Sequence, residues 1–263
     1  GADLDGVLVG TSFMRDVNLS KEVKIGNKVI VIGGGNVAMD CARTARRLGA
    51  TEVGVSCLEC CDDMPADISE VDQAREEGIE IYDSRSFTKI LSNDRKVSGV
   101  SCLEITGCTF NDDGEAHFDV VSDEEHTLEA DTVIFAIGQV PEVSNSGIIK
   151  TSKMGTITAD SETLMLETNG VFVAGDCFSG VASIIDAIAS GQKSASKIHR
   201  YLQGDVLRVR SISEIPATEI KIDIPSETEK IDRQSMPLLS ASERVSNFKE
   251  VALGFSEEAA IAE

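Results

Sequence analysis

Three consecutive glycines, Gly33, Gly34 and Gly35, stand where a nucleotide phosphate could bind. They follow a β-branched run and precede a helical pattern, which is the setting that a dinucleotide-binding fingerprint requires. We expect Gly33 to allow a tight turn and Gly35 to let the backbone approach a pyrophosphate. The amides near Asn36 and Val37 would then face the phosphate with the positive end of the helix dipole. The alternative is a glycine turn that holds no ligand.

The choice of dinucleotide is expected to depend on Glu59, at the end of the second predicted strand. An acidic side chain there accepts hydrogen bonds from both ribose hydroxyls and repels a 2′-phosphate. No arginine occurs between Arg47 and Arg75, so no local guanidinium is available for NADPH. We therefore predict that the site prefers NADH; the alternative is that Glu59 is an ordinary solvated residue at a strand end.

Cysteines and histidines are weaker candidates for chemistry. Cys57 and Cys60 have C-x-x-C spacing, but no second pair stands at metal-binding distance, so we favour ordinary strand-end cysteines and leave open the roles of these two and of Cys61. The histidines are spread over a predicted strand, a loop and a helix end, and each is expected to be an ordinary surface residue: His117, His126 and His199. We assign no catalytic residue and no metal ligand.

The segments that flank the glycines predict the βαβ unit that would position them. Residues 29–32 are a β-branched run typical of a strand buried on both faces of a parallel sheet. Residues 36–48 predict an amphipathic helix, with Val37 on its apolar face and Arg43 and further arginines on the opposite face. Residues 52–58 predict the next strand.

Later segments continue the alternation of strands and helices. The expected elements are a helix, a short strand, three antiparallel strands, two buried parallel strands and a long helix: residues 67–77, 79–81, 87–91, 97–105, 117–121, 132–137, 171–174 and 182–201. The helix at 67–77 would bury Ile68, and turn signals at 93–94 and 111–114 suggest a meander. Ser256 is expected to cap another helix. The predicted fold class is α/β, a Rossmann-like domain whose parallel sheet is joined by an antiparallel meander.

Composition excludes several classes of protein. A hydrophobic content of 41% over 263 residues is enough to build a core, and no apolar run approaches the length of a membrane span. A net charge of -21 would repel nucleic acid, although a basic partner protein stays open. Seven cysteines without a secretory signal favour a reducing compartment, so we expect a cytoplasmic protein.

The chain resembles the flavoprotein pyridine nucleotide-disulfide oxidoreductase superfamily, and within it the small subunit of glutamate synthase and its relatives. The matching segments are residues 33–40, 64–66, 74–78, 137–141 and 175–191. The resemblance implies an NAD(P)H-dependent oxidoreductase with FAD, in which electrons pass on to an iron-sulfur partner. Hydride would pass directly from nicotinamide to flavin, so the protein supplies position and electrostatics and no acid-base side chain.

The resemblance also implies roles for residues outside the glycine loop. Gly138, with Ile137 and Gln139 beside it, matches the crossover between the nicotinamide and flavin domains. Asp176, after Gly175, matches the acidic residue that holds the ribityl chain of FAD. Two further residues, Ser183 and Ile184, match positions whose amides lie near the pyrimidine edge of the flavin, where a helix start would stabilise negative charge.

The chain departs from the family pattern in two respects. Relatives that use NADPH carry arginines at the positions of Leu58 and Glu59, which favours NADH here. The first glycine fingerprint, which binds the FAD pyrophosphate, and the cysteine-rich segment before it are absent. We therefore expect a fragment with low affinity for FAD and doubtful turnover of its own.

The expected domains follow from these assignments. Residues 1–25 would be a partial FAD-domain segment, 26–138 the NAD(P)-binding domain, 139–204 the C-terminal part of the FAD-binding domain and 205–263 a linker or arm. Two alternatives to an oxidoreductase fragment stay open. One is a nucleotide-binding module without redox activity, and the other is a docking surface for electron-transfer subunits.

Overall fold

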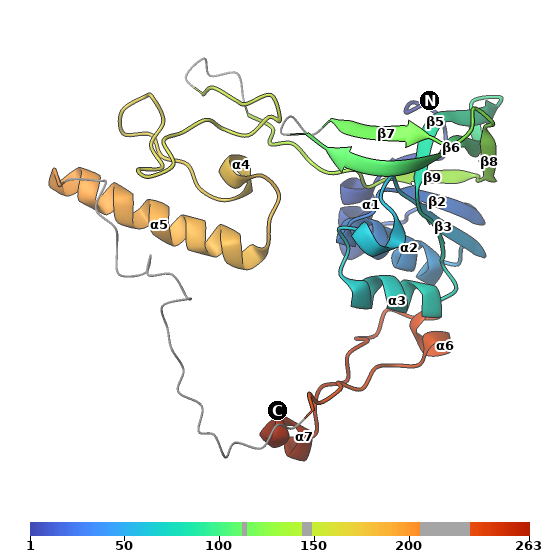
Figure 1. Cartoon of the computed structure of the whole chain (residues 1–263). Coiled ribbons are helices and arrows are strands. Elements are labelled where there is room, and N and C mark those ends of the chain that lie inside the picture. The colour runs from blue at the N-terminus through green and yellow to red at the C-terminus, as the bar shows by residue number, and fades with distance from the viewer. Residues whose placement is uncertain (112–114, 144–148, 206–231) are drawn as a thin grey trace. The chain divides into compact units, whose positions relative to one another are not determined.

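The computed structural model describes residues 1–111, 115–143, 149–205 and 232–263, without the side chain of Cys61. Residues 112–114 of the predicted turn at 111–114, and residues 206–231 of the predicted arm, lie outside the described residues. Contacts divide the chain into two units, Gly1–Ile137 with Ile231–Glu263, and Gly138–Lys230. Each unit is described by itself, and Figure 1 shows the elements of both. The assignment of these stretches to FAD and NAD(P) domains stays a prediction, with residues 1–25 lying in the first unit.

A parallel sheet forms the centre of the first unit (Figure 1). Its strands are β1 (Val7–Val9), β2 (Lys28–Ile32), β3 (Glu52–Ser56), β4 (Glu80–Tyr82) and β9 (Thr132–Phe135). Their order is β1-β9-β2-β3-β4, and every neighbouring pair is parallel. Four of them confirm strands expected from the sequence. The fifth, β1, was not predicted because three residues are too few to show a period.

Helices cover one face of this sheet: α1 (Gly10–Asn18), α2 (Asn36–Arg47) and α3 (Ile68–Glu76). The strand residues Val29 and Val31 pack in one cluster with Ala38, Ala42 and Ala45 of α2. Those three alanines have no exposed surface, and their small side chains allow the helix to lie close to the sheet. The predicted βαβ unit is confirmed.

An antiparallel sheet covers the other face. Its strands are β5 (Arg85–Asn93), β6 (Lys96–Phe110), β7 (Ala116–Val120) and β8 (His126–Glu129). The order β5-β6-β7 confirms the expected meander, and β8, which was not predicted, also pairs with β6. Ile30, Ile32 and Val133 of the parallel sheet pack against Val100 of β6. The central strands β2 and β9 are thus buried on both faces, which explains their continuous apolar runs.

The faces of the helices differ from the prediction at three residues. Val37 is 41% exposed and Ile68 is 77% exposed, although both were expected to be buried. Arg43 was expected to face solvent and is only 7% exposed. Arg43 is buried because α2 packs against α3 as well as against the sheet. The buried surface of α2 therefore includes the side on which Arg43 contacts Glu77. A hydrophobicity pattern cannot report a buried face made of ion pairs.

In the second unit the described helices are α4 (Asp176–Ser179) and α5 (Ile184–Gln203). The long helix was expected, and Ser183 caps it in a reciprocal arrangement with Asp186. The prediction of a parallel strand at 171–174 was wrong: Phe172 forms an isolated antiparallel bridge with Met165. Local turn contacts explain this, because the N–H of Leu166 and the C=O of Val171 are already hydrogen-bonded to each other. None of the described helices is both long and apolar enough to cross a bilayer.

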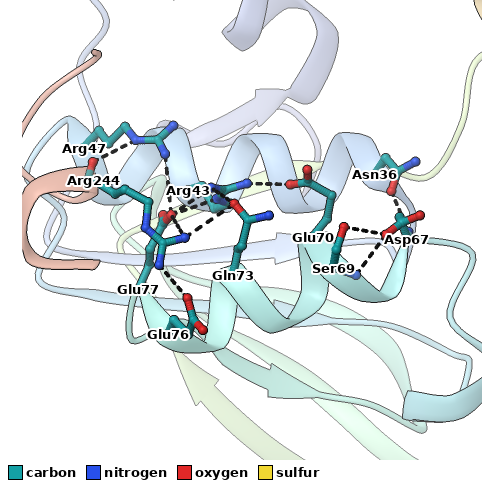
Figure 2. A network of polar contacts seen from close by, with 10 residues as sticks. All are labelled: Asn36, Arg43, Arg47, Asp67, Ser69, Glu70, Gln73, Glu76, Glu77 and Arg244. Atoms are coloured by element: carbon teal, nitrogen blue, oxygen red, sulfur yellow. Dashed lines mark hydrogen bonds and ion pairs between the residues drawn. The ribbon is translucent and has the colours of Figure 1, made fainter. Parts of the chain in front are cut away.

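The C-terminal segment 232–263 packs with the first unit and contains α6 (Ala241–Arg244) and α7 (Glu257–Ala262). Ser256 caps α7 as expected. Arg244 is 3% exposed, and its Nη2 lies 2.5 Å from Oε2 of Glu76. The carbonyl oxygen of Arg244 accepts a hydrogen bond of 2.9 Å from Nε of Arg47 (Figure 2). These contacts attach the segment to α2 and α3.

Replacing Arg244 with alanine is expected to lower the free energy of unfolding by about 1–3 kcal/mol, since its charged hydrogen bonds are lost. The substitution should also speed proteolysis between residues 232 and 263, followed by mass spectrometry. Arg233→Ala is the matched control, because that side chain is 89% exposed and pairs only at the surface with Glu263. Equal proteolysis of the two variants would show that Arg244 does not hold the segment.

Candidate functional site

The candidate site lies at the carboxyl ends of β2, β3 and β9. From β2 the chain proceeds through α2 to β3 and on to β4, and both strands lie to one side of β2 within the sheet. The strands β9 and β1 lie to the other side of β2. The direction of succession therefore reverses between β2 and β9. In open α/β sheets, ligands bind outside the carboxyl ends of strands at such a switch point. The topology places the glycine loop there.

Gly33 makes the turn that was expected of it. Its φ is +134°, and a Cβ atom at this position would lie 2.3 Å from the carbonyl oxygen of Ala136. Its N–H donates a hydrogen bond of 2.9 Å to the carbonyl oxygen of Ser56. The loop after β2 is thus in direct contact with the ends of both neighbouring strands. Ala136 was not singled out from the sequence, because only the fold brings it to this loop.

Gly35 and the start of α2 have the features of an anion site. Gly35 is the residue before the helix, and a Cβ there would meet no atom within 4 Å. No side chain caps this helix start, and its first turn carries no acidic residue. The first amides of a twelve-residue helix therefore point outward without a side-chain partner. Such an arrangement could hold a pyrophosphate.

Glu59 lies over the middle glycine of the loop. A Cβ on Gly34 would lie 2.8 Å from Oε2 of Glu59, so the carboxylate is in close contact with the backbone of this glycine and would have to shift for a larger residue. The carbonyl oxygen of Glu59 accepts a hydrogen bond of 3.0 Å from the N–H of Ser84, which holds its backbone. The structure thus brings together two features that stand 24 residues apart, counted from Gly35 to Glu59. This separation along the chain is close to the roughly 20 residues that the dinucleotide fingerprint places between its glycines and its acidic residue.

The segment after Glu59 is acidic. Asp62 and Asp63 are exposed, and the thiol of Cys60 donates a 3.0 Å hydrogen bond to Oδ2 of Asp63. That bond raises the pKa of the Cys60 thiol, so its reactive thiolate is disfavoured. Cys57 is buried, and its thiol lies 3.4 Å from the carbonyl oxygen of Glu59. Within the described ranges, no group of three or more metal-ligating side chains could hold an ion.

The residues proposed for the domain crossover stand at the boundary of the two units. Ile137 ends the first unit and is 63% exposed. Gly138 begins the second with a φ of +101°, and Gln139 is exposed. All three follow Ala136, which touches the glycine loop. These three residues are therefore at most three positions along the chain from a residue that contacts the candidate nucleotide site.

The flavin candidates lie in the second unit. Gly175 has a φ of +73°, with no atom within 4 Å of a Cβ position, and Asp176 after it is exposed. This open turn beside a carboxylate leaves room for a hydroxyl-bearing chain such as the ribityl group. Ser183 caps α5, and Ile184 at its first position is 81% exposed. The hydroxyl of Ser183 lowers the pKa of Asp186, whose ionised carboxylate lies in the first turn.

Comparison with known proteins identifies the family. The family model described as pyridine nucleotide-disulphide oxidoreductase matches residues 2–191. The beta subunit of an NADP(+)-dependent formate dehydrogenase from Moorella thermoacetica is 34% identical over 258 residues, which are 95% of this chain and 36% of that protein. The small chain of an NADPH glutamate synthase from Azospirillum brasilense is 36% identical over 182 residues, 67% of this chain and 37% of that protein.

Among solved structures, T. acidophilum thioredoxin reductase is similar, with a TM-score of 0.57 and 25% identity. The match covers 75% of this chain and 58% of that chain. This chain therefore spans little more than a third of the length of the two relatives. The α/β fold and the resemblance to glutamate synthase small chains are confirmed. The chain belongs to the pyridine nucleotide-disulphide oxidoreductase family.

Proposed function

We propose that this chain binds NADH as part of an FAD-dependent oxidoreductase that passes electrons on to iron-sulfur centres. The supporting observation is the glycine loop at the switch point, where an open Gly35 and an uncapped helix start lie beside the carboxylate of Glu59. An anion-binding helix end next to a hydrogen-bond acceptor matches the pyrophosphate and ribose of a dinucleotide. Family membership supports a nicotinamide and a flavin cofactor.

The residues of the chain would bind and orient the reactants. Amides at the start of α2, near Asn36 and Val37, hold the pyrophosphate, and Glu59 accepts hydrogen bonds from the ribose hydroxyls. In the second unit, Asp176 holds the ribityl chain, and the backbone amides near Ser183 and Ile184 lie close to the flavin. The ionised carboxylate of Asp186 in the first turn of α5 already faces the positive end of that helix, which reduces its effect on a second negative charge. When bound, nicotinamide and flavin supply the hydride chemistry themselves. No acid-base side chain is needed, so no catalytic residue is proposed.

The proposed preference for NADH rests on the acidic residues that follow β3. The two relatives carry NADP(+) or NADPH in their names, which weighs against the preference only weakly, because nucleotide choice depends on a few side chains. Here Glu59 and the exposed Asp62 and Asp63 put three carboxylates within five residues of one another. Each additional negative charge raises the cost of placing a phosphate nearby.

The proposed partner is an electron-accepting subunit or domain with iron-sulfur centres. Both relatives are named as a subunit or a small chain of a larger enzyme, which supports such an arrangement. The net charge of -21 would favour a partner with a basic contact surface. A cytoplasmic location stays a prediction of the sequence.

One titration tests the proposal. The chain is titrated with NADH and NADPH, and the visible spectrum is recorded after FAD is added. We expect tighter binding of NADH, and a yellow protein whose flavin absorbance bleaches when NADH is supplied. Binding of NADH without retained flavin would instead support a nucleotide-binding module without redox activity. If neither nucleotide binds, the proposal is wrong.

Replacing Glu59 with arginine is expected to reverse nucleotide preference. The hydrogen bonds to the ribose hydroxyls are lost, which weakens NADH binding by about 10-fold to 100-fold, while a guanidinium beside a 2′-phosphate strengthens NADPH binding. Dissociation constants for both nucleotides measure the effect. Glu52→Arg is the matched control, since Glu52 is an exposed acidic residue at the start of β3, whereas Glu59 follows the end of that strand. A preference that moves equally in both variants would refute the role of Glu59.

A further inference from the structure

Hydrogen bonds join the start of α2 to the segment before α3. The side-chain Oδ1 of Asn36 accepts a hydrogen bond of 2.8 Å from the backbone N–H of Asp67. The carbonyl oxygen of Gly34 accepts one of 3.0 Å from the N–H of Ala66. Figure 2 shows Asn36 and Asp67 facing each other at one end of the polar contacts between the two helices. The segment after β3 is therefore attached to the glycine loop itself.

The same segment is attached at its beginning. The carbonyl oxygen of Cys57 accepts a hydrogen bond of 2.8 Å from the N–H of Arg85, and that of Glu59 accepts one from Ser84. The side chain of Glu59 and the exposed Asp62 and Asp63 lie on this segment, after its attachment at Cys57 and before its attachment at Ala66 and Asp67. We name residues 57–67 the acidic loop. Its position over Gly34 depends on contacts at both ends.

Asn36 provides the side-chain contact at the far end of the acidic loop. The backbone N–H of Asp67 can only donate a hydrogen bond, so Asn36 must present its side-chain oxygen, and not its NH₂ group, to Asp67. The side chain thus reaches sideways to α3 and does not cap its own helix, and the first amides of α2 stay open for a ligand. Asp67 is itself fixed, because its Oδ1 accepts from the N–H of Ser69 at 2.9 Å and so caps α3. A mobile acidic loop could neither present a carboxylate to a ribose nor repel a phosphate at a defined place.

We propose that Asn36 is a positioning residue for nucleotide selection: its contact with Asp67 holds the acidic loop over the glycine loop, so that NADH is accepted and NADPH is rejected. This inference rests on the proposed function of the site. It assigns to the side chain of Asn36 a task separate from that of its backbone amide. Loss of the side-chain oxygen should loosen this end of the loop, which then keeps the hydrogen bond from Ala66 to Gly34 as its contact with the glycine loop, while the backbone amide of Asn36 is still present.

The test compares three variants of the full chain by isothermal titration with NADH and with NADPH. Asn36→Ala removes the acceptor, and we expect the ratio of the two affinities to fall by about 10-fold, since NADH is bound less tightly and NADPH is repelled less. Asn36→Asp keeps an acceptor but adds a negative charge beside the phosphates. It should weaken both nucleotides and leave their ratio within about 3-fold of the original.

Gln73→Ala is the matched control, because Gln73 accepts a 2.9 Å hydrogen bond from Arg43 between the same two helices, away from the loop. Its ratio should not change. If Asn36→Ala does not fold, Asn36→Ser takes its place, since serine is shorter and cannot reach Asp67. A ratio unchanged in Asn36→Ala or Asn36→Ser, while Glu59→Arg alters it, would overturn the positioning role alone. A wild-type chain that binds neither nucleotide would overturn both proposals.

Discussion

Replacing Glu77 with glutamine is expected to lower the free energy of unfolding by about 3–5 kcal/mol, because it removes the negative charge from a buried cluster of guanidinium groups. The Glu77 side chain has no exposed surface. Its Oε1 accepts hydrogen bonds from Nε and Nη2 of Arg43 at 3.0 and 2.8 Å. The guanidinium groups of Arg47 and Arg244 lie 3.5 and 3.6 Å from the same oxygen (Figure 2).

The charges of these arginines act on one another. Burial lowers the pKa of Arg47, the charge of Glu77 opposes that shift, and the charges of Arg43 and Arg244 add to it. For Arg43, burial also acts to lower the pKa, but its hydrogen bond and charge interaction with Glu77 raise it overall. Glutamine preserves the shape of the side chain and one acceptor oxygen. The substitution therefore isolates the contribution of the charge.

Denaturant unfolding followed by far-ultraviolet circular dichroism measures this effect, since the chain contains no tryptophan. Glu76→Gln is the matched control: Glu76 is 60% exposed and pairs with Arg244 alone among the three arginines. It should lose about 1 kcal/mol or less. If the two variants lost the same stability, the buried charge of Glu77 would not be what holds α2, α3 and α6 together.

Replacing Gly33 with alanine is expected to destabilise the fold and the nucleotide site together. An L-residue at a φ of +134° is strained, and its Cβ would lie 2.3 Å from a backbone oxygen, which cannot move as a flexible side chain can. We expect a loss of at least about 2 kcal/mol in unfolding free energy and of about 100-fold in NADH affinity. Both measurements are made on the same preparation.

Gly35→Ala separates the two effects. Gly35 has a φ of -93°, and its Cβ position is open, so the fold should keep its stability within about 0.5 kcal/mol. The added methyl group would nevertheless occupy the space where a pyrophosphate approaches the backbone. NADH affinity should therefore fall while unfolding is unchanged. Unaltered affinity in Gly35→Ala would contradict the placement of the pyrophosphate at this loop.

The βαβ unit could be predicted because its signals are local. The β-branched run of β2, the glycines after it and the periodicity of α2 each lie within a few residues of one another. Burial of a parallel strand on both faces leaves a continuous apolar run that one sequence displays. The turn at Gly33 and the cap of α7 were predictable for the same reason.

The error at Arg43 concerns a residue whose environment comes from a distant part of the chain, whereas the wrong strand at 171–174 reflects a local turn. Arg43 is buried because α3 presents Glu70, Gln73 and Glu77 to it. The sequence contains a weak signal of these polar faces. Arg43 and Arg47 are four residues apart, and Glu70, Gln73 and Glu77 follow one another at intervals of three and four residues. Helical spacing puts each set on one face. Nothing local shows that the two faces meet.

By itself, the sequence determined the identity of the glycine loop, the class of the fold and the acidic residue that the ribose is proposed to meet. Only the tertiary structure decided how these parts are joined: Glu59 lies over Gly34, Ala136 closes on Gly33, and Asn36 holds Asp67. The physical reason is range. Turn geometry, capping and periodicity act between residues a few positions apart, whereas the site is assembled by parallel strand pairing, which brings the ends of distant segments to one edge of a sheet.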